Sequence, residues 1–106
     1  MKQDILKIIQ AIQESFSDAT MVYTKGGCWG FHEILKSIFP SAKAFETNDE
    51  KGHIVTKIGD KFYDIQGEWI DKCGKLKGKA FALTAKQKRW WKANTYGQRV
   101  EKMLAK

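Results

Sequence analysis

Two β-rich runs between His53 and Gln66 constrain the fold more than any other feature of the chain. The runs His-Ile-Val-Thr-Lys-Ile and Lys-Phe-Tyr-Asp-Ile-Gln are separated only by Gly59-Asp60. A two-residue connection with glycine first is typical of the tight turn of a β-hairpin. The sequence therefore predicts an antiparallel hairpin over residues 53–66.

The register of this hairpin decides which side chains meet. Pairing Ile58 with Lys61 places Val55 opposite Asp64 and His53 opposite Gln66. Because strand side chains alternate, one face receives His53, Val55, Lys57, Phe62, Asp64 and Gln66. The other face receives Ile54, Ile58, Tyr63 and Ile65. His53 and Asp64 are then diagonal neighbours, or nearly opposite if the turn contains a bulge, and both arrangements allow a hydrogen bond.

Two amphipathic helices are expected before the hairpin. Apolar residues recur at helical spacing from Lys2 to Phe16 and again from Cys28 to Phe39, where Pro40 ends the pattern. Between them, Thr20 to Thr24 is β-prone but short. Lys43 to Glu46 is a second short candidate strand.

The sequence after the hairpin predicts a linker and a helix. Lys72 to Lys79 is rich in lysine and glycine, and a helix is expected to start near Thr84. Gly97 is a candidate break before Val100 to Leu104.

Size and composition indicate one domain. The chain has 106 residues, of which 42% are hydrophobic and 29% are charged, within the range of a single globular unit. We expect an α+β fold with N-terminal helices packed on a small antiparallel sheet, a central hairpin and a basic C-terminal helix. The predicted domain spans residues 1–106, with the basic helical segment at about 80–106. A large enclosed cofactor pocket is not expected in so small a domain, and we assign no cofactor.

The N-terminal residues indicate a cytoplasmic protein. Polar residues such as Asp4 and Glu14 interrupt any signal-peptide pattern, and no run approaches the ~18 apolar residues of a membrane span. Cys28 and Cys73 are then expected to be reduced thiols rather than a disulfide. Oligomeric state is left open.

Positive charge is concentrated near the C-terminus. Residues 1–66 carry 8 Lys and Arg against 9 Asp and Glu, whereas residues 67–106 carry 11 against 3. This asymmetry favours an acidic partner, either nucleic acid or an acidic protein surface.

Cys28 is the candidate nucleophile. It follows two glycines and opens an apolar helix, and the unpaired N–H groups at a helix start lower the pKa of a thiol. A nearby imidazole could take the proton, and a carboxylate on the other ring nitrogen would orient it. The backbone N–H of Cys28 could bind a developing oxyanion.

The segment Gly27-Cys28-Trp29-Gly30-Phe31 resembles the cysteine helix of papain-like and transglutaminase-like enzymes. The next catalytic elements of those families are similar to the strand with His53, the turn and the strand with Asp64. The resemblance therefore covers roughly residues 24–67. It implies thiol acyl transfer or amide hydrolysis, with Cys28 as nucleophile, His53 as general base and Asp64 as orienting acid. No glutamine stands just before Cys28 as in papain; Gln66 is a weak substitute for the oxyanion donor, and Trp29 is a candidate pocket wall.

The same residues could instead have purely structural, non-catalytic roles. Cys28 could be a small buried hydrophobe, and His53 and Asp64 could be solvated strand residues. A zinc site of Cys28, His32, His53 and Cys73 matches no strong spacing signature, and a partly exposed helical position is the expectation for His32. We assign no metal.

The C-terminal segment is the second functional candidate. Its cations and aromatic rings could contact phosphates and stack on bases; they are Lys86, Lys88, Arg89, Trp90, Trp91, Lys92 and Arg99. Alternatively, one tryptophan packs on the core and the charges form a solvated face.

The leading hypothesis is a cysteine-dependent acyl-transfer or amide or thioester hydrolase-like protein. The alternative is a non-catalytic basic binding module on the same fold, for example a phage-encoded inhibitor. A compact basic protein of this kind suits a phage or mobile-element setting.

Overall fold

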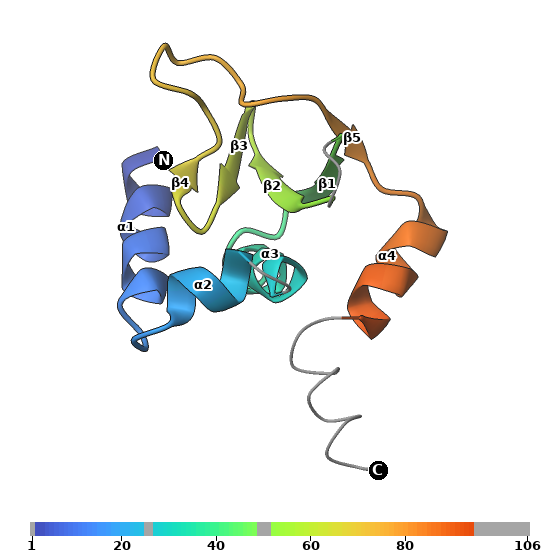
Figure 1. Ribbon diagram of the computed structural model, residues 1–106, viewed down its shortest axis with the longest axis horizontal. Helices are drawn as coiled ribbons and strands as arrows, with labels where there is room; N and C mark the ends of the chain where they lie inside the picture. The colour runs from blue at the N-terminus through green and yellow to red at the C-terminus, as the bar shows by residue number, and fades with distance from the viewer. Residues whose placement is uncertain (1, 25–26, 49–51, 95–106) are drawn as a thin grey trace.

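The computed structural model describes residues 2–24, 27–48 and 52–94. In chain order the elements are α1 (Lys2–Gln13), α2 (Ala19–Thr24), α3 (Cys28–Ile38), β1 (Lys43–Thr47), β2 (Ile54–Ile58), β3 (Lys61–Asp64), β4 (Gly67–Glu68), β5 (Ala80–Ala82) and α4 (Ala85–Ala93). The first three helices lie together beside the sheet, and α4 stands at the opposite end of the molecule from α1 (Figure 1). The predicted α+β class, with N-terminal helices, an antiparallel sheet and a basic later helix, is confirmed.

The predicted hairpin forms the centre of the sheet. Strand order is β4-β3-β2-β1-β5, and every neighbouring pair is antiparallel. Ile58 pairs with Lys61, as expected, and Gly59 in the turn has a φ of 65°, a conformation that favours glycine. The β2–β3 pairing runs to Thr56–Tyr63 and does not extend to the expected Val55–Asp64 and His53–Gln66 pairs.

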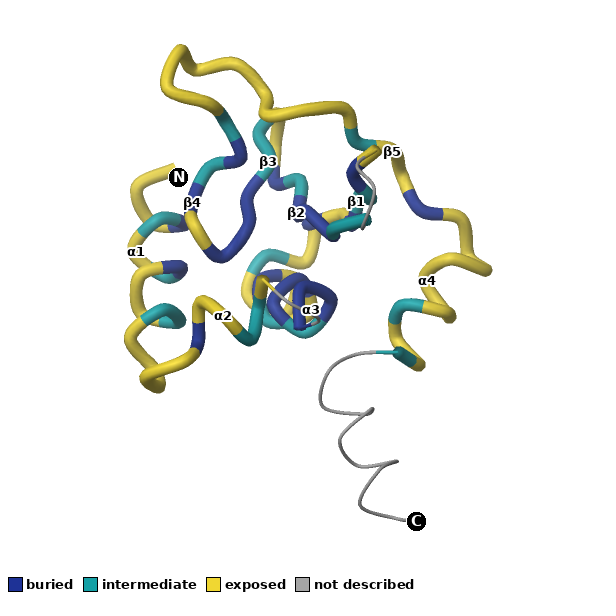
Figure 2. Tube along the Cα trace, in the orientation of Figure 1, coloured by how far each residue is buried: buried dark blue, intermediate teal, exposed yellow. Residues whose placement is uncertain are grey.

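The apolar face of the hairpin packs on the helices. Ile58, Tyr63 and Ile65 form one buried cluster with residues of α1 and α3, namely Ile5, Ile9, Phe31 and Leu35. Figure 2 shows buried positions along α1, α3 and the central strands, where these elements lie next to one another. Burying a large aliphatic or aromatic side chain contributes roughly 1.5–3 kcal/mol, so this cluster is the principal apolar contact between the helices and the sheet.

Residues 20–24 are helical, so the β-prone reading of Thr20 to Thr24 was wrong. Val22 N–H donates to the carbonyl of Asp18 at 2.9 Å, and Ala19 is fully buried. Tyr23 packs between Phe16 and Phe31, with ring centroids 6.0 and 5.9 Å away. Tertiary packing therefore overrides a weak local strand propensity.

The first helix ends earlier than its apolar pattern indicated. It stops at Gln13, three residues before the predicted Phe16, and Ser15 Oγ donates to the carbonyl of Ile12 at 2.7 Å. A serine hydroxyl competes in this way with the backbone bonds that would continue a helix.

The last part of the chain contains two strands that the sequence analysis missed. Ala80–Ala82 pairs with β1, and the two-residue β4 pairs with β3. Both are too short to show a period-two pattern. The linker over Lys72 to Lys79 is confirmed as a loop, and Asp71 Oδ1 organises it by accepting the N–H groups of Cys73 and Lys75.

The helix predicted near Thr84 is α4. Thr84 is its N-cap: its hydroxyl accepts Gln87 N–H, and the Gln87 side chain accepts Thr84 N–H, which is a capping box. The predicted break at Gly97 and the stretch Val100 to Leu104 lie outside the described residues. Within the described part of the chain, no helix is both long and apolar enough to cross a bilayer.

Gly27 allows α2 and α3 to meet closely. Its N–H donates to the carbonyl of Val22 at 2.8 Å, and a Cβ placed on Gly27 would lie 2.6 Å from that oxygen. Any side chain at this position would therefore require the backbone to move. This glycine therefore sets the position at which α3, and with it Cys28, begins.

We expect Gly27→Ala to lower the free energy of unfolding by about 1–3 kcal/mol, the usual cost of overpacking. Chemical denaturation followed by circular dichroism measures this loss. Gly30→Ala is the matched control, because its Cβ would meet nothing closer than Tyr23 Cε1 at 3.9 Å and alanine is the better helix former. Equal stability of the two variants would contradict the role given to Gly27.

Candidate active site

Cys28 occupies the first position of α3. Gly27 is the N-cap, and its carbonyl accepts Phe31 N–H at 3.0 Å. The N–H groups of a first helical turn have no acceptor within the helix and carry partial positive charge. The Cys28 side chain is only 4% exposed, and the cysteine is free.

His53 and Asp64 are brought together at one end of the hairpin. His53 Nε2 lies 3.5 Å from Asp64 Oδ2, and the two side chains are 20% and 10% exposed. His53 precedes β2 by one residue, and Asp64 is the last residue of β3. The prediction that these two residues meet is confirmed, although they meet beyond the regular pairing of the strands.

The backbone of the following turn fixes the Asp64 carboxylate. Asp64 Oδ1 accepts the N–H of Gln66 at 2.9 Å, two residues later, the geometry of an Asx turn. One carboxylate oxygen is thereby held by the backbone and the other faces His53. Gln66 reaches Asp64 through its main chain, and the residue is exposed.

His53 interacts with both of its predicted partners. Burial disfavours the imidazolium, but the interactions of the ring with Asp64 and, after it, Cys28 outweigh this and raise the pKa of His53 from 6.5 to about 9. Asp64 approaches the Nε2 atom of the ring. His53 therefore contacts Asp64 and also interacts electrostatically with Cys28.

The surroundings of Cys28 also fit part of the structural alternative. The side chain packs in an apolar cluster with Trp29, Ala44, Ile54 and Leu83. A purely structural cysteine would be buried in the same way. A purely structural cysteine would not, however, need the electrostatic interaction with His53.

His32 is buried, so the expectation of partial exposure was wrong. Only 3% of the residue is exposed, and its Nδ1 lies 2.9 Å from Thr56 Oγ1 on β2. Burial, followed by the nearby charges of Lys36 and Lys88, lowers the pKa of His32 to about 4, so the ring is neutral at pH 7. Among residues 2–24, 27–48 and 52–94, no three His, Cys, Asp or Glu side chains are grouped to hold a metal ion.

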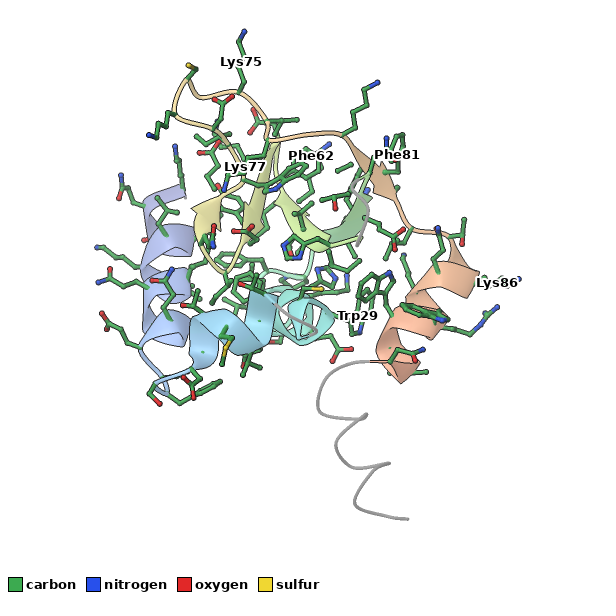
Figure 3. The ribbon with its side chains drawn as sticks, viewed as in Figure 1. Trp29, Phe62, Lys75, Lys77, Phe81 and Lys86 are labelled. Atoms are coloured by element: carbon green, nitrogen blue, oxygen red, sulfur yellow. The ribbon has the colours of Figure 1, made fainter. Side chains whose placement is uncertain are left out.

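The predicted basic residues of α4 divide between two sides of the helix. Lys88, Arg89 and Lys92 line a pocket against α3, whereas the labelled Lys86 points away from the rest of the molecule (Figure 3). Trp91 is half-buried, and its Nε1 donates to Glu46 Oε1 at 2.5 Å, which ties α4 to β1. Trp90 is 52% exposed. Arg99 lies outside the described residues.

The pocket between α3 and α4 has a volume of about 550 Å³. Trp29 belongs to its wall, and its indole N–H donates to Glu33 Oε1 at 2.5 Å. The sequence analysis missed three charged lining residues, Glu33, Lys36 and Lys43. Two of them were detectable, because Trp29, Glu33 and Lys36 follow one another at four- and three-residue spacing on one helical face.

A family model described as Phage YunG-like protein matches residues 5–104, nearly the whole chain. The chain therefore belongs to this family, whose name supports the expected phage association. Neither the curated proteins nor the solved structures contain a match.

The raised pKa of His53 predicts a loss of stability at alkaline pH. Its contribution to the free energy of unfolding is fully present below pH 6.5 and is lost as the pH rises through about 9; for this shift it is of order 3 kcal/mol. We expect the difference between the native chain and His53→Gln, measured by denaturation from pH 6 to about 10, to shrink across this range. Parallel curves would contradict the proposed charge interactions.

Proposed function

We propose that this member of the Phage YunG-like family is a cysteine-dependent acyl-transfer or hydrolase-like protein of the papain-like and transglutaminase-like kind. The observation that supports it best is the approach of His53 Nε2 to Asp64 Oδ2 at 3.5 Å, together with the electrostatic interaction of His53 with Cys28. A thiol beside a charged imidazole at a helix start is the usual environment of a reactive cysteine. The substrate would contain an amide, thioester or ester bond.

In the first step, the Cys28 thiolate attacks the carbonyl carbon and an Sγ–C bond forms. The carbon–leaving group bond breaks, and the His53 imidazolium gives its proton to the departing nitrogen, sulfur or oxygen. The enzyme is then an acyl-thioester on Cys28, and His53 is neutral.

In the second step, water or another acyl acceptor attacks the thioester carbon while His53 takes its proton. The Sγ–C bond breaks, the acyl product leaves, and the thiolate–imidazolium pair is restored. Asp64, held by the Gln66 N–H, keeps the ring oriented through both steps.

The oxyanion of each tetrahedral intermediate would be bound by the backbone N–H of Cys28 in the first turn of α3. Gln66 was the other candidate donor. Its contact with Asp64 runs through the main chain, so the proposal assigns it to positioning the carboxylate.

We expect Cys28 to be alkylated by iodoacetamide with a pH midpoint well below that of a free thiol, about 8.5. Cys73 is exposed and serves as the internal control in the same molecule. Mass spectrometry of the two cysteine peptides over a pH series gives both midpoints. The midpoint is compared rather than the absolute rate, because burial of Cys28 slows its reaction at every pH.

His53→Ala should move the Cys28 midpoint up toward that of Cys73 without changing Cys73 itself. Asp64→Asn should produce a smaller shift in the same direction. A native Cys28 that titrates together with Cys73 would reject the catalytic proposal and leave a structural cysteine.

The second candidate function is a basic binding module for nucleic acid or an acidic protein. The specific observation in its favour is the outer side of α4, where the half-exposed Trp90 lies on the same helix as the outward-pointing Lys86 (Figure 3). An exposed ring beside cations suits single-stranded nucleic acid.

For this second function we expect Trp90→Ala combined with Lys86→Glu to weaken binding of a single-stranded oligonucleotide by about tenfold or more, because a stacked base contributes roughly 1–3 kcal/mol. Fluorescence anisotropy at several salt concentrations measures it. Cys28→Ser should bind normally, and Lys75→Glu controls for net charge. Unchanged binding by the double variant would exclude this side of α4 as the surface that binds the oligonucleotide.

A further inference from the structure

Positive charge converges on the pocket between α3 and α4 from three elements. Lys36 comes from α3, Lys43 from the start of β1, and Lys88, Arg89 and Lys92 from α4; Glu33 is the single carboxylate in the lining. All five cations are exposed to solvent.

These cations are not neutralised by the protein. Within the described part of the chain, the ion pairs involve Lys2, Lys61 and His53, and none of the five pocket cations is paired with a carboxylate. Lys36 is held by backbone carbonyls: its Nζ donates to Ala42 at 3.1 Å and to Pro40 at 3.3 Å. Glu33 accepts the indole N–H of Trp29. The pocket therefore retains an excess of positive charge.

The floor of the pocket is largely apolar. Trp29, Ala42 and Ala44 line it together with His32. The low pKa of His32, caused by burial and then by Lys36 and Lys88, leaves a neutral ring in the floor at pH 7. A ligand that fits this pocket thus combines a strongly anionic part with a flat or apolar part.

We propose that the α3–α4 pocket binds a small nucleoside phosphate, with its phosphates among Lys36, Lys43, Lys88, Arg89 and Lys92 and its base against the Trp29 side. Phosphate is favoured over a single carboxylate because several cations converge and Arg89 can bind two phosphate oxygens at once. The volume of about 550 Å³ lies within the usual range for small-molecule sites.

This site is independent of the acyl-transfer proposal. Trp29 is adjacent to Cys28 in the sequence and shares its apolar cluster, but binding of the ligand uses none of the three catalytic candidates. Cys28→Ser should therefore bind the ligand as the native chain does, so failure of either proposal leaves the other standing.

The test is isothermal titration calorimetry of the whole chain with ATP, inorganic tripolyphosphate and adenosine. We expect ATP to bind most tightly, tripolyphosphate more weakly, and adenosine weakest. Arg89→Glu and Lys92→Glu should each weaken ATP binding about tenfold or more, the usual effect of losing a charge-assisted hydrogen bond.

Two charge-matched variants control this experiment. Lys86→Glu alters the same helix but on the side away from the pocket, and Lys75→Glu alters the distant loop (Figure 3). Both should stay within about twofold of the native affinity. Losses in the controls equal to those in the pocket variants would overturn the proposal, as would binding of an oligonucleotide without any binding of ATP. Circular dichroism confirms that each variant is folded.

Discussion

The candidate active site depends on the packing of α3 across the hairpin. Phe31 and Leu35 are buried against Ile58 and Tyr63, and this apolar contact holds the start of α3 beside the ends of β2 and β3. His32 adds a buried hydrogen bond to Thr56, which resists sliding of the helix because an unpaired polar group in the core is costly. This packing allows Cys28 to interact electrostatically with His53, although 24 residues separate them in sequence.

Local signals in the sequence were sufficient for the hairpin, α3 and α4. Gly59 marks the turn, Pro40 follows the end of a strong apolar stripe, and Thr84 with Gln87 forms a cap that can be read directly. The turn, the helix end and the cap each depend on only a few neighbouring residues. The meeting of His53 and Asp64 could also be anticipated, because the two residues lie at the same end of a short hairpin.

Features decided by distant contacts were not predictable in this way. Residues 20–24 are helical because Tyr23 packs on Phe31, which no local propensity reveals. Strand β5 exists because β1 offers it an edge. Lys36 and Lys43 line the same pocket as Arg89 only because α4 lies against α3.

Helix α4 is attached differently from the other helices. None of residues 85–93 is buried, and Trp91 links α4 to the sheet through its hydrogen bond to Glu46 and its packing against the cluster that contains Ala44 and Ile54. Segments with few buried contacts open at low free energy, independently of global unfolding. Detachment of α4 would remove Lys88, Arg89 and Lys92 from the pocket without involving the contact between His53 and Asp64, so the cationic pocket could be lost while the candidate active site stays folded.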